Sequence, residues 1–169
     1  MPVVISAAGY ATLYAPVALT VPEGVTAYTL ADNGDYLTAT AVSTIPANTG
    51  VVLAGAEGTY SFEITTGGSA TSCLTGNIYT AAAPANCYTL AIEDEVAGFY
   101  KYTGETVKGF KAYFENTTGV KGFALSFTEA DAIKAVEAAQ AGNVYDLNGR
   151  KVVKAQKGIF IQNGKKVVK

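Results

Sequence analysis

Cys73 and Cys87 are the residues of this 169-residue chain with the greatest capacity for covalent chemistry. Thirteen residues lie between them, and a disulfide that closes a loop of about 15 residues adds roughly 3 kcal/mol through loop-closure entropy. Spacing does not fix the Cβ geometry that a bridge needs. Two alternatives therefore stay open: a disulfide, or two separate buried thiols. A metal site is not predicted, because two thiols without any histidine are too few ligands.

Two acidic clusters are the next candidates for chemistry. Asp32-Asn33-Gly34-Asp35 places oxygen ligands close together, but it lacks the alternating spacing and the downstream bidentate Glu of a calcium loop. Glu93-Asp94-Glu95 supplies three adjacent acids, and immediate neighbours on a strand point to opposite faces. We therefore interpret both clusters as hairpin turns.

The rest of the sequence lacks the residues and motifs that most enzymes use. The chain has no His, which removes the commonest general base and activator of nucleophiles. It also has no G-x-S-x-G or S-x-x-K motif for a nucleophilic serine. Paired-carboxylate glycosidase chemistry stays open, since thirteen acids lie before Asn143. We predict a protein that is not an enzyme and that uses no cofactor.

Eleven tyrosines allow two interpretations. Aromatic faces stack on sugar rings, so exposed coplanar tyrosines would indicate a carbohydrate-binding module. In a small β protein, tyrosines more often cover sheet edges and the rim of the core, and we favour this second interpretation. The tyrosines concerned lie in or beside predicted strands: Tyr10, Tyr14, Tyr28, Tyr36, Tyr100, Tyr102 and Tyr113.

Alternating apolar and polar residues predict an all-β fold. Apolar residues at every second position recur at 37–41, 60–65, 110–114 and 123–127, and Gly-, Pro- and Asn-rich turns separate these runs. We expect an antiparallel β-sandwich of about nine strands over residues 1–128. Residues 69–85 are predicted to form a loop with at most one helical turn, and 129–142 a linker.

Residues 143–169 are predicted to form a tail of two hairpins. Asn148-Gly149 and Asn163-Gly164 favour two-residue type I′ turns, pairing 144–147 with 150–153 and 158–162 with 165–168. The tail has a net charge of +6 and the preceding 142 residues one of −8. We expect the tail to dock on its own chain or on a second copy, giving a monomer or a weak dimer. Its basic residues are interspersed with apolar ones, so nucleic acid is not a predicted partner.

The tail sequence NVYDLNGRKVVKAQKGIFIQNGKKVVK resembles the C-terminal sorting domain of type IX secretion substrates in Bacteroidetes. The residues that carry the resemblance are Tyr145, Asp146, Gly149, Arg150, Gly158, Gly164 and Lys165. Shorter phrases such as 45–53 and 98–102 resemble β-rich modules of Bacteroidales surface proteins.

The resemblance implies an exported protein at the outer-membrane surface or outside the cell, with the secretion machinery as a partner of the tail. The uncharged first 21 residues fit neither a signal peptide nor a membrane span, because they lack a basic start and contain Gly9 and Pro16. We expect the targeting signal to lie outside this chain. The expected function is a non-enzymatic structural or adhesive module of a larger precursor, acting on an unidentified protein or glycan. The alternative is a carbohydrate-binding module that uses surface tyrosines.

Overall fold

The computed structural model describes residues 1–127 and, beyond them, 144–145, 151–152, 159–162 and 165–168. These residues form strands and no helix, which confirms the predicted all-β class. The chain divides into two compact units, Met1–Phe127 and Thr128–Lys169. The linker predicted at 129–142 lies outside the described residues.

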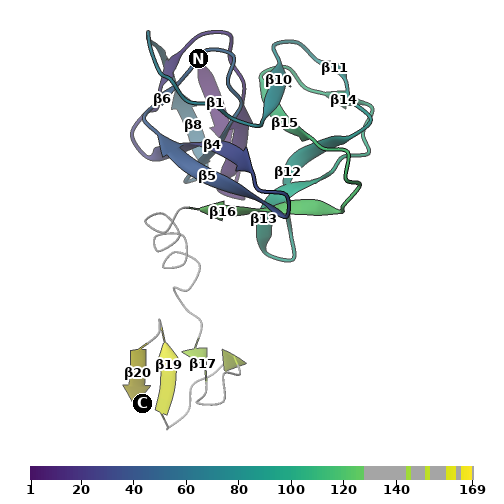
Figure 1. The fold of residues 1–169 in the computed structure, drawn as a ribbon. Coiled ribbons are helices and arrows are strands. Elements are labelled where there is room, and N and C mark those ends of the chain that lie inside the picture. The colour runs from purple at the N-terminus through teal and green to yellow at the C-terminus, as the bar shows by residue number, and fades with distance from the viewer. Residues whose placement is uncertain (128–143, 146–150, 153–158, 163–164, 169) are drawn as a thin grey trace. The chain divides into compact units, whose positions relative to one another are not determined.

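One nine-stranded sheet dominates the first unit (Figure 1). Its neighbouring strands run antiparallel with one exception, because β16 and β5 are parallel and place Leu125 opposite Leu37. In spatial order the strands are β10 (Thr75–Asn77), β15 (Lys111–Glu115), β12 (Cys87–Glu93), β13 (Val96–Lys101), β16 (Gly122–Phe127), β5 (Tyr36–Val42), β4 (Val25–Asp32), β7 (Val51–Gly55) and β2 (Tyr10–Leu13).

The two ends of this sheet curve toward each other, so the sheet is nearly a barrel. The Tyr14 amide donates to the carbonyl of Phe110 at 3.1 Å, and the Ala112 amide donates to Thr12 Oγ1 at 3.3 Å. The first contact joins Tyr14, which follows β2, to Phe110, which precedes β15. The second joins β2 and β15 themselves. Two stacked antiparallel sheets, as the sandwich prediction required, are not confirmed.

Three small sheets complete the first unit. They are β1 (Pro2–Ile5) with β8 (Gly58–Ser61), β11 (Ala81–Ala82) with β14 (Thr106–Val107), and β3 (Leu19–Thr20) between β6 (Thr44–Ile45) and β9 (Glu63–Ile64). The unit thus has sixteen described strands, and about nine was an underestimate. The loop predicted at 69–85 contains β10 and β11, whose short segments pair because β15 and β14 offer free edges.

The strand predicted over 60–65 is interrupted at Phe62. Its amide donates to the carbonyl of Met1 at 2.9 Å, and its carbonyl accepts a hydrogen bond from the amino terminus at 2.6 Å. The chain leaves its partner β1 there and joins β3 at the next residue, Glu63. Ile64 is consequently exposed, although the alternation predicted it to be buried.

The strands β2, β7 and β4 have a core on each face. Along β7, Val51 and Leu53 belong to the first core, which also contains Leu13, Leu19 and other residues of the N-terminal half. Val52, between them, belongs to the second core, which is rich in aromatic side chains and contains Tyr88, Phe99, Phe114 and Phe123. Successive strand residues point to opposite faces. Because consecutive residues of β7 are apolar, both of its faces are buried.

The described strands of the second unit form an antiparallel sheet in the order β18 (Lys151–Val152), β17 (Val144–Tyr145), β19 (Ile159–Gln162) and β20 (Lys165–Val168). β19 and β20 pair with Gln162 opposite Lys165, which is the register that a two-residue Asn163-Gly164 turn requires. β17 and β18 pair with Val144 opposite Val152. This register is one residue away from the predicted pairing of 144–147 with 150–153, and Asn148-Gly149 lies outside the described residues.

Candidate functional site

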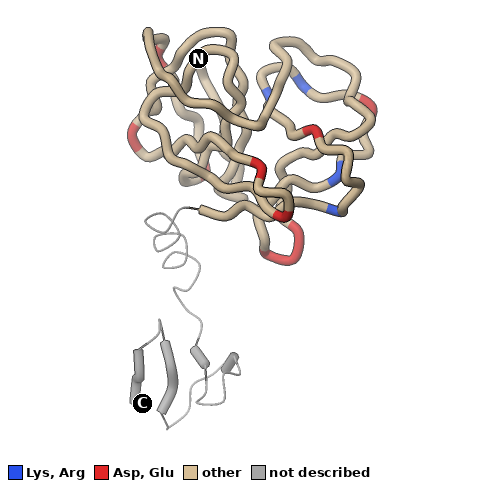
Figure 2. Tube along the Cα trace, viewed as in Figure 1, with Lys and Arg blue, Asp and Glu red and all other residues tan. Residues whose placement is uncertain are grey.

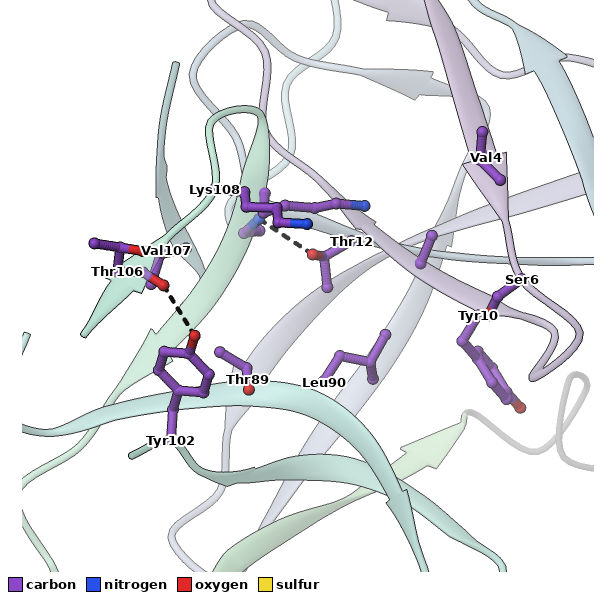
Figure 3. A pocket seen from close by; sticks show the side chains of 13 residues that line it. Val4, Ser6, Tyr10, Thr12, Thr89, Leu90, Tyr102, Thr106, Val107 and Lys108 are labelled. Atoms are coloured by element: carbon purple, nitrogen blue, oxygen red, sulfur yellow. Dashed lines mark hydrogen bonds between the residues drawn. The ribbon is translucent and has the colours of Figure 1, made fainter. Parts of the chain in front are cut away.

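A cleft lies where the two ends of the large sheet meet, and it is the candidate functional site of the first unit (Figure 3). Its volume is about 450 Å³, within the range of about 300 to 1,000 Å³ typical of small-molecule sites. It is lined by two lysines, six hydroxyl-bearing residues and five apolar ones: Lys108, Lys111, Ser6, Tyr10, Thr12, Thr89, Tyr102, Thr106, Val4, Ala11, Leu90, Val107 and Ala112.

Hydrogen bonds hold two walls of the cleft in place. Thr12 Oγ1 accepts from the Ala112 amide and ties β2 to β15. On the other side, the Tyr102 hydroxyl donates to the carbonyl of Thr106 at 2.9 Å, so the ring spans the turn between β13 and β14. Figure 3 shows Lys108 and Thr106 toward one end of the cleft and Ser6 and Tyr10 toward the other, with Thr89 and Leu90 between them. The cleft is therefore elongated.

The segment that carries the two lysines is held by its backbone. At Gly109, an added Cβ would lie 2.7 Å from the carbonyl oxygen of Ile78, so only glycine permits this approach. Phe110 follows with a φ of 59°, a left-handed conformation that is rare for a bulky side chain. Together they turn the chain between Lys108 and Lys111, so that both side chains line one cleft.

Lys108 and Lys111 give the cleft a positive charge. Burial lowers the pKa of Lys111, and the nearby charge of Lys108 lowers that pKa further. Neither lysine forms an ion pair within residues 1–127, where the ion pair present joins Lys121 to Glu93. The thirteen lining residues include no Asp, Glu, His or Cys. The cleft therefore offers two amines and six hydroxyl-bearing side chains to a ligand.

The two cysteines are free thiols, so the disulfide considered above is not formed in this structure. Cys73 packs against the second core, whereas Cys87 lies with Val107 and Tyr113 in a third cluster. Burial, and then the charge of Asp32, raises the pKa of Cys73 to about 11. Burial, and then the charge of Glu115, raises the pKa of Cys87 to about 11. Both thiols are protonated and weakly nucleophilic at neutral pH.

Both acidic clusters form hairpin turns. Asp32 and Tyr36 flank the β4–β5 turn, in which Gly34 has a φ of 86° and its amide donates to the Asp32 carboxylate at 2.8 Å. In the β12–β13 hairpin Glu93 pairs with Val96, and Asp94 and Glu95 both have positive φ. Among the described residues no group of three His, Cys, Asp or Glu side chains could hold a metal ion.

The described tyrosines differ in their exposure. Tyr28, Tyr88 and Tyr113 are buried, and Tyr36 and Tyr79 are exposed. Several of the half-buried tyrosines cover hairpins. The hydroxyls of Tyr60 and Tyr100 each donate at 3.1 Å to a carbonyl four residues earlier.

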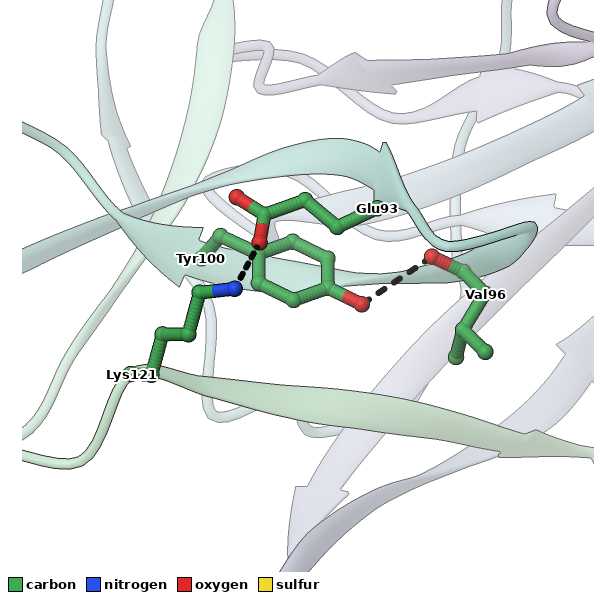
Figure 4. Close-up of polar contacts among 4 residues, drawn as sticks. All are labelled: Glu93, Val96, Tyr100 and Lys121. Carbon is green, nitrogen blue, oxygen red and sulfur yellow. Dashed lines mark hydrogen bonds and ion pairs between the residues drawn. The ribbon is translucent and has the colours of Figure 1, made fainter.

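Tyr100 shows why such rings are held in place. An added Cβ at Gly122, its cross-strand partner, would lie 2.4 Å from the Tyr100 ring. The ring thus covers a glycine that has no side chain of its own to pack. Figure 4 shows the Tyr100 hydroxyl bonded to Val96, and also the 2.8 Å ion pair that joins Glu93 of the same hairpin to Lys121, just before β16.

Of the tail residues singled out from the sequence, Tyr145 lies in β17 opposite Lys151 and Ile161, and Lys165 lies in β20 opposite Gln162. Asp146, Gly149, Arg150, Gly158 and Gly164 lie outside the described residues. Within the part of the chain that is described, no helix is long and apolar enough to cross a membrane.

Lys108 and Lys111 were not recognised as site residues from the sequence. The available signal was their rarity, because residues 1–127 contain four lysines and no arginine, and two of the four occur within four positions. Comparison with known proteins finds no family model, no curated protein and no solved structure that matches this chain.

Proposed function

We propose that this chain is a non-enzymatic, ligand-binding module of an exported surface protein, with an adhesive role. The observation that carries the proposal is the cleft at the meeting point of β2 and β15, whose lining holds lysines and hydroxyls but no carboxylate, imidazole or thiol. A module that holds a ligand without transforming it needs such a lining on a rigid scaffold. The scaffold here is a sheet in which β4, β7 and β2 have a core on each face.

The surface location rests on the resemblance of residues 143–169 to a type IX sorting domain. The β19–β20 register fits the part of this resemblance that reads KGIFIQNGKKVVK. Tail-dependent export can be tested by fusing residues 129–169 to a periplasmic reporter in a bacterium with this machinery. Appearance of the reporter at the cell surface is expected. Full retention in the periplasm, with a known sorting domain exported in parallel, would contradict the proposed route.

The binding role can be tested by filling the cleft. Thr89 lines the cleft, and Thr89→Phe should occupy its middle (Figure 3). The matched control is Thr40→Phe on β5, at an exposed position outside the cleft. Beads coated with the full chain are applied to mixed surface glycans and proteins, and the retained material is quantified. Loss of retention with Thr89→Phe but not with Thr40→Phe is expected, at unchanged melting temperatures.

Equal retention by the two variants would overturn the cleft as the binding site. The non-enzymatic part of the proposal has a separate readout. Mass spectra of the retained material should be identical before and after long incubation with the chain. Any new product that also depends on an open cleft would refute it.

A further inference from the structure

The first unit is acidic overall, but its cleft is positively charged. Residues 1–127 contain ten acids and four lysines, and acidic positions are spread around the trace (Figure 2). None of the ten acids lines the cleft, whereas two of the four lysines do. Burial, and then the like charge of Lys108, lowers the pKa of Lys111, so the loss of water and the repulsion between the two amines both disfavour its charged form. An anionic ligand would offset the repulsion between the two lysine amines.

Hydroxyls supply most of the remaining polar lining. Two of them are engaged in the fold, because Thr12 Oγ1 accepts from Ala112 and the Tyr102 hydroxyl donates to Thr106. Ser6, Tyr10 and Thr89 make no such side-chain hydrogen bond among the described residues. A hydroxyl both donates and accepts, so these three groups complement a ligand that itself carries hydroxyls. A phosphate, which mostly accepts, would leave their acceptor capacity unused.

We propose that the cleft binds an acidic saccharide, with a sugar carboxylate at Lys108 and Lys111 and ring hydroxyls along Thr89, Tyr10 and Ser6. This inference rests on the proposed binding function and names its ligand class. Lys108 and Lys111 supply the positive charges of the lining, so the carboxylate of the saccharide is expected beside them. In this proposal the saccharide binds in a cleft lined in part by Tyr10 and Tyr102, and not on a flat platform of tyrosines.

The test compares two ligands with the same saccharide backbone, one with charged carboxylates and one with uncharged methyl esters. Tetragalacturonic acid and its fully methyl-esterified form are titrated into the full chain, and binding is followed by calorimetry and by amide chemical shifts. The acid should bind at least tenfold more tightly than the ester, because each carboxylate–lysine contact is a charge-assisted hydrogen bond. The shifts should lie at the cleft residues, and binding should weaken with added salt.

Three variants identify the residues responsible. Lys108→Gln and Lys111→Gln should each weaken binding of the acid about tenfold and leave the ester unaffected. Lys101→Gln is the matched control, since Lys101 is exposed on β13 and lies outside the cleft. It should bind as the unmodified chain does. Tetraglutamate, which carries carboxylates without sugar rings, should bind at least tenfold more weakly than the tetrasaccharide.

The outcomes separate this inference from the proposed function. Equal binding of acid and ester, or tetraglutamate binding as tightly as the tetrasaccharide, overturns the acidic saccharide while leaving a working cleft. Binding of neither tetrasaccharide also overturns the inference. The binding part of the proposed function fails when filling the cleft with Thr89→Phe leaves retention of surface material unchanged.

Discussion

Leu53→Ala tests whether the two large cores of the first unit form one cooperative structure. Leu53 is fully buried in the first core, and its strand, β7, also carries Val52 in the second core. The strand register places Ala11 and Ala27 on either side of Leu53. Leu53 is therefore the one large side chain in a row of three, and its small neighbours cannot fill the space that it leaves.

The expected loss is large for this reason. Leu→Ala substitutions in cores cost about 2.7 to 5 kcal/mol, with the higher values where the cavity persists, so we expect about 4 kcal/mol. Unfolding entropy near 60 °C is about 2.1 cal/mol/K per residue. Applied to residues 1–127, this value converts the loss into a melting temperature lower by roughly 15 °C.

The assay follows both cores during thermal unfolding. Methyl resonances of Leu19 report on the first core and those of Leu37 on the second, and calorimetry gives the overall enthalpy. Both resonances should shift to the same lower midpoint, because β7 belongs to both cores. Ile64→Ala, at a position that is 73% exposed, is the control and should cost less than about 0.5 kcal/mol. A lower midpoint for Leu19 alone, or a loss below about 1 kcal/mol, would refute the reasoning.

Three further predictions concern the thiol, a strained turn and the tail. Burial and the charge of Glu115 raise the pKa of Cys87 from 9.0 to about 11, so the unfolded thiol ionises first as the pH rises. The protonated Cys87 thiol contributes on the order of 2 kcal/mol to the free energy of unfolding. This contribution is complete below pH 9 and is lost between about pH 9 and 11. Urea unfolding of Cys87→Ala should lack this part of the alkaline decline, and identical pH profiles would contradict the prediction. Replacing Asp94-Glu95 by Asn-Gly should raise the free energy of unfolding by about 1 kcal/mol, since both residues have positive φ; calorimetry that shows a loss would count against that turn geometry. A chain that ends at Gly142 should keep a cooperative thermal transition, and light scattering at low and high salt should show a monomer or a salt-sensitive weak dimer only when the tail is present. Salt-insensitive oligomers that survive removal of the tail would disprove the docking prediction.

The features that local sequence predicted are those with local causes. The turn at 32–35 follows from the positive φ that Gly34 tolerates, and the β19–β20 register is the one that the Asn163-Gly164 pair predicted. The alternation over 123–127 likewise predicted β16, whose Phe123 is buried. The pattern at 60–65 failed because Phe62 bonds to Met1, sixty-one positions away. No window of neighbouring residues contains that information.

By itself, the sequence determined the all-β class, the positions of most turns, the basic tail and the absence of histidine chemistry, because backbone preferences and side-chain chemistry belong to individual residues. Tertiary structure alone decided that β16 runs parallel to β5, and that Cys73 and Cys87 lie in separate clusters. It also brought Thr12 to Ala112, one hundred positions along the chain, and so created the cleft and gave Lys108 and Lys111 their surroundings. Which strand edges meet depends on the packing of the whole chain against the entropy of closing long loops, and that balance is not a property of any single segment.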